Sequence, residues 1–276
     1  MVFDVDIWLK AYVQAVQARF GPRIRLIGLQ GSFSRGEASE GSDVDVVLIL
    51  DAVSARDLAD YSEALDGLPE RERVCGFISG EAELTAWEPS DLFQFLYDTK
   101  PILGNLDTLR EKIGPDDLRR AVWAGVCNMY HMCAHNMVHE KSPDILRSLY
   151  KSAVFTLQAI AFRQTGRYAG RKKELGPLLQ PEERRILEAE THCRHCRDLS
   201  PEAFAALSDQ LLRWASAWIL RCAEAWTEAV DMRTEEQMLR LIAAVSQADR
   251  DSIWRSVLWR VICLTGLPGR WRRVLA

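Results

Sequence analysis

The first hundred residues alternate between short apolar runs and amphipathic segments. Apolar side chains recur at helical spacing from Leu9 to Phe20, and Gly21-Pro22 ends this predicted helix. Two β-branched runs, Ile24 to Leu29 and Val44 to Leu50, have the length and composition of strands. The same patterns predict a helix at 58–65, a strand at 73–78, a helix at 92–97 and a last strand at 101–103. This alternation predicts an α/β (α+β) domain around a small mixed sheet.

The remainder of the chain has a purely helical pattern. Long periodic segments cover 118–138, 145–164, 201–230 and 235–264, which predicts an all-α helical bundle. Gly104-Asn105 and Gly114-Pro115 separate the two patterns. We therefore predict one domain at residues 1–105 and a helical bundle domain at residues 115–276.

Charge supports the same division. The chain has 276 residues, of which 48% are apolar and 27% charged, with a net charge of −4. This composition is typical of a globular protein, and the charge argues against a protein that binds polyanions over its whole surface. Residues 1–105 carry 9 Lys and Arg against 18 Asp and Glu, whereas the remainder carries 26 against 21. The two parts thus differ in the sign of their net charge.

The apolar runs, the first residues and the cysteine count indicate the cellular compartment of the protein and the redox state of its cysteines. Its longest apolar runs are far shorter than the ~20 residues that span a bilayer, so no membrane contact is expected. Asp4 and Asp6 stand where a secretory signal would carry bases. Seven cysteines, an odd number, predict reduced thiols rather than a disulfide framework. We expect a cytoplasmic protein.

One segment carries recognisable chemistry. A predicted strand runs into Gly31-Ser32, and Ser42-Asp43-Val44-Asp45 then opens a second strand. Side chains alternate along a strand, so Asp43 and Asp45 project to the same side. Two adjacent carboxylates repel each other unless a cation lies between them, and Mg²⁺ is often held by one or two carboxylates together with substrate phosphates. The pair therefore predicts a magnesium site.

The residues before this pair suit a phosphate group. Glycine at position 31 allows close approach of the backbone, and the Ser32 hydroxyl and Arg35 guanidinium can contact phosphate oxygens. Metal ions beside such a pocket stabilise the attacking and leaving oxygens of a nucleotidyl transfer.

Gly31-Ser32, ten intervening residues and then Asp43-Val44-Asp45-Val46 resemble the signature of the polymerase-beta-like nucleotidyltransferase superfamily, in its minimal, aminoglycoside-nucleotidyltransferase-like branch. The segment from Arg35 to Ala38, and Ser42 before the first Asp, strengthen the resemblance. It covers roughly residues 20–105. The resemblance implies transfer of a nucleoside monophosphate from an NTP, with ATP expected, to an acceptor hydroxyl with release of pyrophosphate. It further implies that Asp43 and Asp45 are catalytic and hold Mg²⁺ in a two-metal site, and that the nucleotide is bound by Gly31, Ser32, Arg35 and Ser42.

The sequence departs from this family pattern at a third carboxylate. Many active members carry an additional acid on a later strand, but the strand predicted at 73–78 contains none. The nearest acids are Glu72, Glu81, Glu83 and Asp98; any of them could fold into the site, but each is more simply a solvated surface acid. This gap leaves the base of the reaction unassigned.

The helical part resembles, more weakly, the HEPN-like bundles that accompany these enzymes. The residues that carry this resemblance include His135-Asn136-Met137 and the segment from Leu149 to Ala153. Such a bundle would wall off an acceptor site, with Lys151, Arg163 and Arg171 as candidates to face the nucleotide, although each is more simply a solvated helix charge. Ribonuclease activity is not predicted, because the only Arg and His at usable spacing, Arg185 and His192, lack the accompanying polar residue.

Three further features have simpler explanations. His131, His135 and His139 share a helix face, and we interpret them as a polar stripe lining the cleft between the domains. Cys193 and Cys196, near His192, form half of a zinc site with no second Cys-x-x-Cys, which leaves open a structural zinc completed by a distant Cys or by a partner chain. Arg and Trp interleave from Trp254 to Arg273, a pattern that more often packs a helix core than binds nucleic acid.

The leading prediction is a Mg²⁺-dependent nucleotidyltransferase acting on a small hydroxylated acceptor, and a homodimer is left open. Two alternatives remain. The missing third acid would favour a catalytically weak, nucleotide-binding regulatory or antitoxin-like protein. The basic helical part would favour an enzyme that modifies a protein or tRNA.

Overall fold

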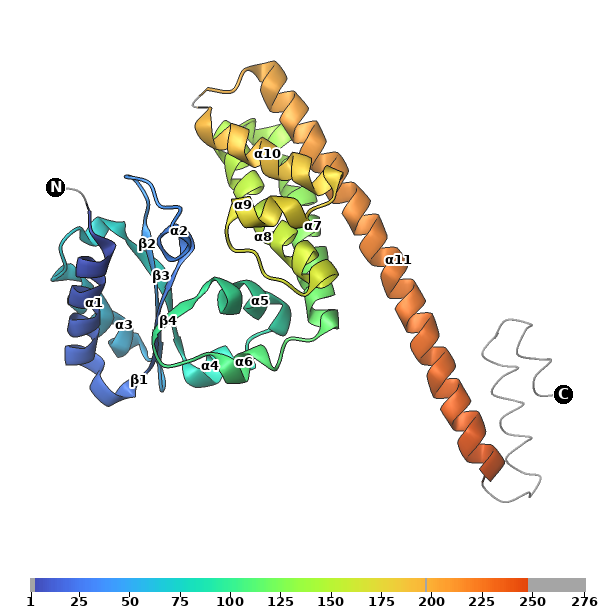
Figure 1. The fold of residues 1–276 in the computed structure, drawn as a ribbon, viewed down its shortest axis with the longest axis horizontal. Helices are drawn as coiled ribbons and strands as arrows, with labels where there is room; N and C mark the ends of the chain where they lie inside the picture. Colours follow the sequence, from blue (N-terminus) through green and yellow to red (C-terminus); the bar gives the residue numbers. More distant parts are fainter. Residues whose placement is uncertain (1–2, 197, 248–276) are drawn as a thin grey trace. The chain divides into compact units, whose positions relative to one another are not determined.

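The structure is a computed structural model, and it describes residues 3–196 and 198–247. The chain divides into two compact units, Met1–Cys222 and Ala223–Ala276. The first unit contains a sheet layer and a helical layer (Figure 1). The predicted boundary between residues 105 and 115 falls inside this unit and stays a prediction.

Four strands form the predicted small mixed sheet, in the order β3-β2-β1-β4. β1 is antiparallel to both β2 and β4, whereas β2 is parallel to β3. The two β-branched runs of the sequence are therefore the two central strands, where burial is greatest. The strands are β1 (Ile24–Gln30), β2 (Val44–Leu50), β3 (Val74–Gly80) and β4 (Lys100–Leu103).

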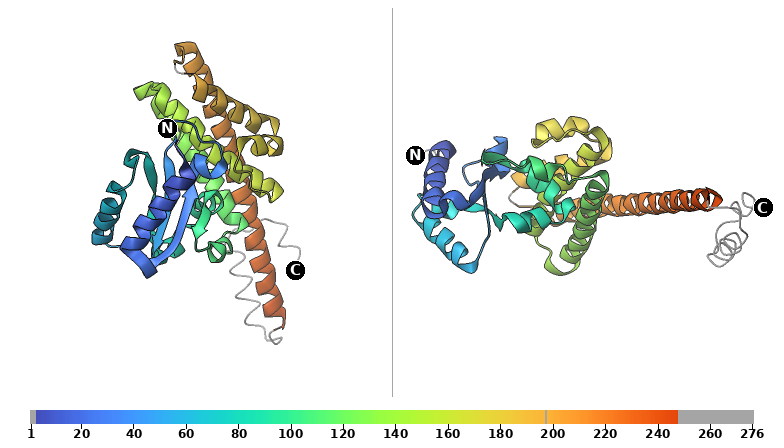
Figure 2. Two further views of the ribbon diagram at one scale, coloured as in Figure 1. Left: turned by 60° about the vertical axis from the view of Figure 1, so that its left-hand side comes forward. Right: turned by 90° about the horizontal axis from the view of Figure 1, so that it is seen from below.

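Helices cover both faces of this sheet (Figure 2). Val44, Val46 and Leu48 of β2 pack into one core cluster with α1 and α3, whereas Val47 and Ile49 pack into another with α4, α5 and α6. This is the period-two alternation of a strand buried on both sides. The helices are α1 (Val5–Phe20), α3 (Ala55–Asp66), α4 (Glu81–Ala86), α5 (Pro89–Asp98) and α6 (Asp107–Arg110), with short 3₁₀ turns η1 (Gly21–Arg23) and η2 (Arg71–Arg73).

The helical layer confirms the predicted all-α region but corrects one detail. The predicted interruption between residues 230 and 235 is wrong, because one helix, α11, continues through it. Neither Gly nor Pro occurs between Glu202 and Gln247, so nothing in the sequence stops the helix there. Its elements are α7 (Pro115–His135), the π-helix η3 (Asn136–Glu140), α8 (Pro143–Thr165), α9 (Lys172–Leu175), η4 (Gly176–Leu178), α10 (Pro181–His195) and α11 (Pro201–Gln247).

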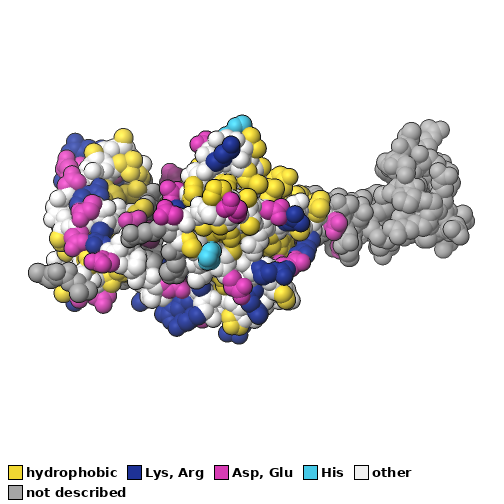
Figure 3. Space-filling model, turned by 90° about the horizontal axis from the view of Figure 1, so that it is seen from above, with side chains coloured by type: hydrophobic (Ala, Val, Ile, Leu, Met, Phe, Trp, Pro, Cys, Tyr) yellow, Lys and Arg dark blue, Asp and Glu magenta, His cyan; other side chains and the backbone are white. Residues whose placement is uncertain are grey.

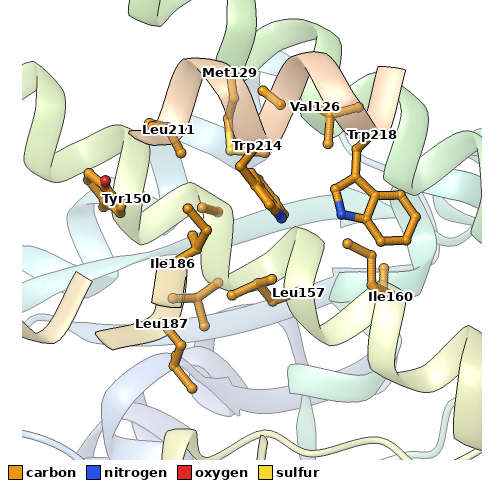
Figure 4. Packing of buried hydrophobic residues seen from close by; sticks show 14 of the residues in the cluster. Val126, Met129, Tyr150, Leu157, Ile160, Ile186, Leu187, Leu211, Trp214 and Trp218 are labelled. Carbon is orange, nitrogen blue, oxygen red and sulfur yellow. The ribbon is translucent and has the colours of Figure 1, made fainter. Parts of the chain in front are cut away.

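The core of the helical layer is apolar with a few satisfied polar groups (Figure 4). Tyr150 of α8 is fully buried and donates its hydroxyl to the Leu207 carbonyl at 2.9 Å. Trp218 donates its indole N–H to the buried Glu183 carboxylate at 3.0 Å. Because an unpaired buried polar group is costly, these two hydrogen bonds stabilise the buried hydroxyl and indole. The two hydrogen bonds connect α11 to α8 and to α10.

An aromatic cluster attaches the helical layer to α5. Tyr97 of α5 stacks on Tyr168 with ring centroids 5.0 Å apart, and it lies 4.8 Å from Phe162 of α8. Phe93, one turn earlier, contacts the same two rings. Aromatic pairs at these separations stabilise beyond the area that they bury. The cluster therefore fixes α8 close to the end of the sheet where α5 terminates.

The surface of the described residues carries charges of both signs. Acidic and basic side chains are interspersed on the face shown in Figure 3, with apolar side chains gathered over the helical layer. Within residues 3–196 and 198–247 no helix is long and apolar enough to span a membrane.

An ion pair at the start of α3 gives a stability prediction. The Asp57 carboxylate pairs with Arg23 and accepts the Ser54 N–H at 2.8 Å, and both contacts lower the pKa of Asp57, Arg23 the more strongly. The ordinary pKa of an aspartate is 3.8, and the folded protein lowers it. The ionised carboxylate therefore stabilises the fold at pH values above 3.8, and this stabilisation is lost as the pH falls below 3.8 toward the pKa of the folded state. We expect Asp57→Asn to lower the Tm at pH 7 and the difference from wild type to shrink near pH 3, as measured by circular dichroism. An equal difference at both pH values would show that the charge of Asp57 carries none of the effect.

Candidate active site

The site begins where β1 ends and β2 starts. The strand register pairs Gln30 with Asp45, so Gly31, the first residue of the short helix α2 (Gly31–Arg35), lies beside Asp45. Asp45 alternates with the buried Val44 and Val46 and therefore faces the side of the sheet that carries α5 and the helical layer. The acidic pair thus lies at the junction of the two layers.

Glycine is required at position 31. Its φ of +69° is a left-handed conformation, and an added Cβ would come within 1.8 Å of the Asp45 carboxylate oxygen Oδ2. Any larger residue would strain the turn and displace Asp45. The structure thus gives a second reason for glycine at this position, the Asp45 carboxylate, while the close approach to a phosphate stays a prediction.

A cavity of about 690 Å³ opens over these residues. It is lined by all six residues predicted from the sequence, namely Gly31, Ser32, Arg35, Ser42, Asp43 and Asp45. The structure therefore brings the whole predicted set together. Their catalytic and binding roles remain predictions.

Asp45 lies in an electrostatically unfavourable position. Burial raises its pKa above the ordinary value, and the charges of Asp43 and Asp98 raise it further, while Lys151 and Arg35 act in the opposite direction. Asp43, by contrast, is exposed. Burial thus makes the ionised form of Asp45 costly, and Lys151 is the neighbouring charge that offsets this cost most.

Asp98 corrects the interpretation of the third carboxylate. Of Glu72, Glu81, Glu83 and Asp98, only Asp98 lines the cavity, and its side chain is 10% exposed rather than solvated. β4 explains its position: Leu29 pairs with Lys100 in antiparallel register, so the chain just before β4 runs past the end of β1. There Asp98 accepts the Gly31 N–H at 3.1 Å and pairs with Arg35.

Arg35 and Ser42 are both engaged within the protein. Arg35 pairs with Asp98 and with Glu37, the latter at 3.4 Å. Burial lowers the pKa of Arg35, but the hydrogen bond and charge of Asp98 and the charge of Glu37 more than offset this, and the pKa is raised. The Ser42 hydroxyl accepts the Ser39 N–H at 2.8 Å and so closes the loop before Asp43.

The three basic residues proposed from the helical part have different positions. Lys151 of α8 lines the cavity and acts on Asp45. Arg163 lines a separate cavity of about 400 Å³ beside Trp218. Arg171 donates its Nε–H to the Arg35 carbonyl at 2.7 Å. Lys151 is therefore the member of this set that a ligand in the main cavity would meet.

Aromatic residues of β3 and α5, with Trp87 directly after α4, form another wall that the sequence interpretation missed. Phe77 lies 5.1 Å from Phe95 and 5.7 Å from Trp87, measured between ring centroids, and Asp91 lines the same cavity. Helix α4, which leads into this wall, is only six residues long and gave no periodic signal. The contribution of Phe77 follows from its pairing with Val47 across β2 and β3.

The other sequence features lie away from the cavity. His131, His135 and His139 are exposed and do not line it, so the expected polar stripe does not reach the cleft. Cys193 is buried, and burial raises the pKa of its thiol to about 11. The Sγ atom of Cys196 lies 3.5 Å from Nε2 of His192. No group of three His, Cys, Asp or Glu able to hold a metal occurs in the described part of the chain. The Trp and Arg residues at 254–273 lie outside the described residues.

Two sequence comparisons find proteins similar to this chain. Residues 9–113 match the family model of the nucleotidyltransferase domain. A protein adenylyltransferase, MntA, of Thermococcus cleftensis is 38% identical over 69 residues, which are 24% of this chain and 68% of that protein.

Two solved structures are also similar. A spectinomycin adenyltransferase of Enterococcus faecialis, solved with ATP and spectinomycin, has 14% identity and a TM-score of 0.49, covering 75% of this chain and 98% of its own. A toxin–antitoxin structure with AMP-PNP has 16% identity and a TM-score of 0.28, covering 37% and 77%. From the family match and the relative, the chain belongs to the polymerase-beta-like nucleotidyltransferase family and is a nucleotidyltransferase.

Proposed function

We propose that this chain is a Mg²⁺-dependent adenylyltransferase that transfers AMP from ATP to a hydroxyl group of a small-molecule acceptor and releases pyrophosphate. The observation that carries the proposal is the cavity whose lining includes Asp43, Asp45, Lys151 and Ser32 together. Carboxylates for a cation and a lysine for an anion, in one cavity, suit a metal–triphosphate ligand. The adenylyltransferase relative supports the choice of ATP.

The residues present fit a magnesium ion. Asp43 and Asp45 supply hard oxygen ligands. Burial is the main cause of the raised pKa of Asp45, so a cation beside it would make its ionised form less costly. Mg²⁺ takes one or two protein carboxylates and completes its shell with phosphates and water, so a pair is sufficient. When bound, Mg²⁺ would supply positive charge to the triphosphate oxygens.

The chain's own groups would bind and orient the substrates. We assign Asp43 and Asp45 to the metal, and Ser32 and Lys151 to phosphate oxygens, which accept hydrogen bonds from a hydroxyl and an ammonium. The acceptor hydroxyl loses its proton to solvent as its oxygen bonds to the α-phosphorus. The bond from that phosphorus to the bridging oxygen of the β-phosphate breaks, and pyrophosphate leaves with the bonding electrons. Holding both substrates in one cavity makes this step effectively unimolecular.

The aromatic wall of the cavity indicates the class of acceptor. Phe77, Trp87 and Phe95 offer apolar surface, and Asp91 beside them offers a hydrogen-bond acceptor. A cavity of about 690 Å³ is within the size range of small-molecule sites. We therefore favour a small hydroxylated molecule, bound between a nucleotidyltransferase domain at residues 1–105 and a helical domain at 115–276.

A protein hydroxyl is the second candidate acceptor. It is favoured by the relative's name, protein adenylyltransferase, although that likeness spans only 69 residues. A chain segment presenting Ser, Thr or Tyr would have to reach Asp45 through the mouth of the same cavity.

The acceptor can be identified by finding which molecule receives labelled AMP from ATP. The purified full chain is incubated with Mg²⁺ and ATP labelled at the α-phosphate, together with hydroxylated small molecules, the chain itself, cell protein or tRNA. Label on a small molecule, with matching pyrophosphate release, supports the proposal, and label on protein supports the second candidate. Binding of Mg²⁺–ATP without pyrophosphate release from any of these acceptors would instead support a regulatory nucleotide-binding protein.

A further inference from the structure

Asp98 makes contacts at both ends of α2. It is the last residue of α5 and its side chain is 10% exposed. One oxygen, Oδ2, accepts the N–H of Gly31, the first residue of α2, at 3.1 Å. The other, Oδ1, pairs with the guanidinium of Arg35, the last residue of α2. A single carboxylate therefore fixes a five-residue helix that is too short to be stable by itself.

The same helix is held from the helical layer. Arg171 donates its Nε–H to the Arg35 carbonyl at 2.7 Å, and the Lys172 N–H donates to the Glu37 carboxylate at 3.1 Å. Glu37 in turn pairs with Arg35 at 3.4 Å. Hydrogen bonds and ion pairs thus run from the segment before α9, through Arg35 and Asp98, to the Gly31 turn.

The geometry points to Asp98 as a positioning residue, which holds Gly31 and Ser32 in place beside Asp45. Both of its oxygens are already engaged by protein donors, which argues against a third metal-binding carboxylate. Loss of Asp98 would release the Gly31 turn, and Gly31 is the residue whose α-carbon packs against the Asp45 carboxylate. This inference rests on the proposed function, because it concerns the wall to which ATP would bind.

Two substitutions separate positioning from metal binding. Asp98→Ala removes both contacts, whereas Asp98→Asn keeps an oxygen for the Gly31 N–H and loses the charge that faces Arg35. Asp57→Asn is the matched control, since Asp57 is also 10% exposed and also pairs with an arginine, but lies at α3 outside the cavity. Each variant is compared by hydrogen–deuterium exchange of peptides covering residues 29–37, by ATP affinity in calorimetry, and by the Mg²⁺ concentration for half-maximal activity.

We expect Asp98→Ala to weaken ATP binding about tenfold, the scale of one lost charge-assisted hydrogen bond, and to speed exchange in α2. Asp98→Asn should recover part of the exchange protection. The Mg²⁺ requirement at saturating ATP should stay at the wild-type value, and Asp57→Asn should change none of the three readouts.

A Mg²⁺ requirement that rises in Asp98→Ala, as in Asp45→Asn, would overturn the inference and make Asp98 a metal ligand. Unchanged exchange and unchanged ATP affinity would overturn it as well. Failure of the proposed function gives a different result, because wild type would then show no Mg²⁺-dependent ATP binding at all. The exchange measurement on ligand-free protein tests Asp98 even in that case.

Discussion

Asp45→Asn is expected to lower the rate of nucleotidyl transfer by about three orders of magnitude. The substitution keeps the size of the side chain but removes the negative charge that we assign to the metal. Charge stabilisation by a catalytic metal contributes several kcal/mol to the transition state, and about 4 kcal/mol corresponds to about a thousandfold in rate. The rate is measured as pyrophosphate release at saturating ATP and acceptor.

Thermal unfolding shows whether the loss is chemical or structural. The pKa of Asp45 is raised by burial and by Asp43, so its ionised form costs stability at neutral pH in the ligand-free protein. Asp45→Asn should therefore have a Tm equal to or above that of wild type without Mg²⁺. Loss of function combined with equal or greater stability is the signature of a binding or catalytic site rather than of a structural acid.

Asp51→Asn is the control at the other end of the same strand. Asp51 directly follows β2, and its pKa is lowered by a backbone hydrogen bond from Ala52 and by Arg23. This variant should lose stability at neutral pH yet keep the wild-type rate. If Asp45→Asn retained near-wild-type turnover, the assignment of the metal to this pair would be wrong.

The centre of the sheet and the acidic pair were predictable because their signals are local. β1 and β2 are continuous β-branched runs that pair with each other; Gly31 directly follows β1, and Asp45 belongs to β2. A segment of some twenty residues therefore contains both sides of the proposed phosphate and metal site. The structure adds that Gly31 is required by the carboxylate beside it.

Asp98 and Lys151 could be placed only by tertiary structure. Asp98 lies 67 residues from Gly31, and what brings them together is the antiparallel pairing of β4 with β1. Lys151 reaches the cavity because Tyr97 and Phe162 pack α8 against α5. Neither contact leaves a periodic trace in the sequence, where both residues look like ordinary surface charges.

The boundaries of two helices, α10 and α11, were also not predicted from the sequence. α10 begins with Pro181 and two acids, a recognisable start signal, but its polar composition hid it from a search for apolar periodicity. For α11 the prediction instead placed a break where the helix continues, although the segment between residues 230 and 235 contains no residue that would stop a helix. Propensity is informative about where a helix can continue, whereas packing decides which face is buried.

Lys151→Met is expected to raise the KM for ATP between about tenfold and a hundredfold, with a smaller effect on kcat. Methionine retains an unbranched apolar stem and removes the charge. Arg35 is neutralised by Asp98, and Arg194 pairs with Glu190 at 3.3 Å, whereas Lys151 forms no ion pair within the described part of the chain. It is thus the cavity cation most available to a phosphate, and a charge-assisted hydrogen bond is worth roughly 1.5–3 kcal/mol.

Arg163→Met is the matched control for this prediction, since it removes a cation from the same helix but lines the separate cavity beside Trp218. It should leave the KM for ATP unchanged. The double variant Lys151→Met/Asp45→Asn adds a further test. Because Lys151 lowers the pKa of Asp45, the two groups interact in the ligand-free protein, and their effects on ATP binding should not add. Strict additivity, or an unchanged KM in Lys151→Met, would mean that the triphosphate lies elsewhere in the cavity and that the helical layer contacts only the acceptor.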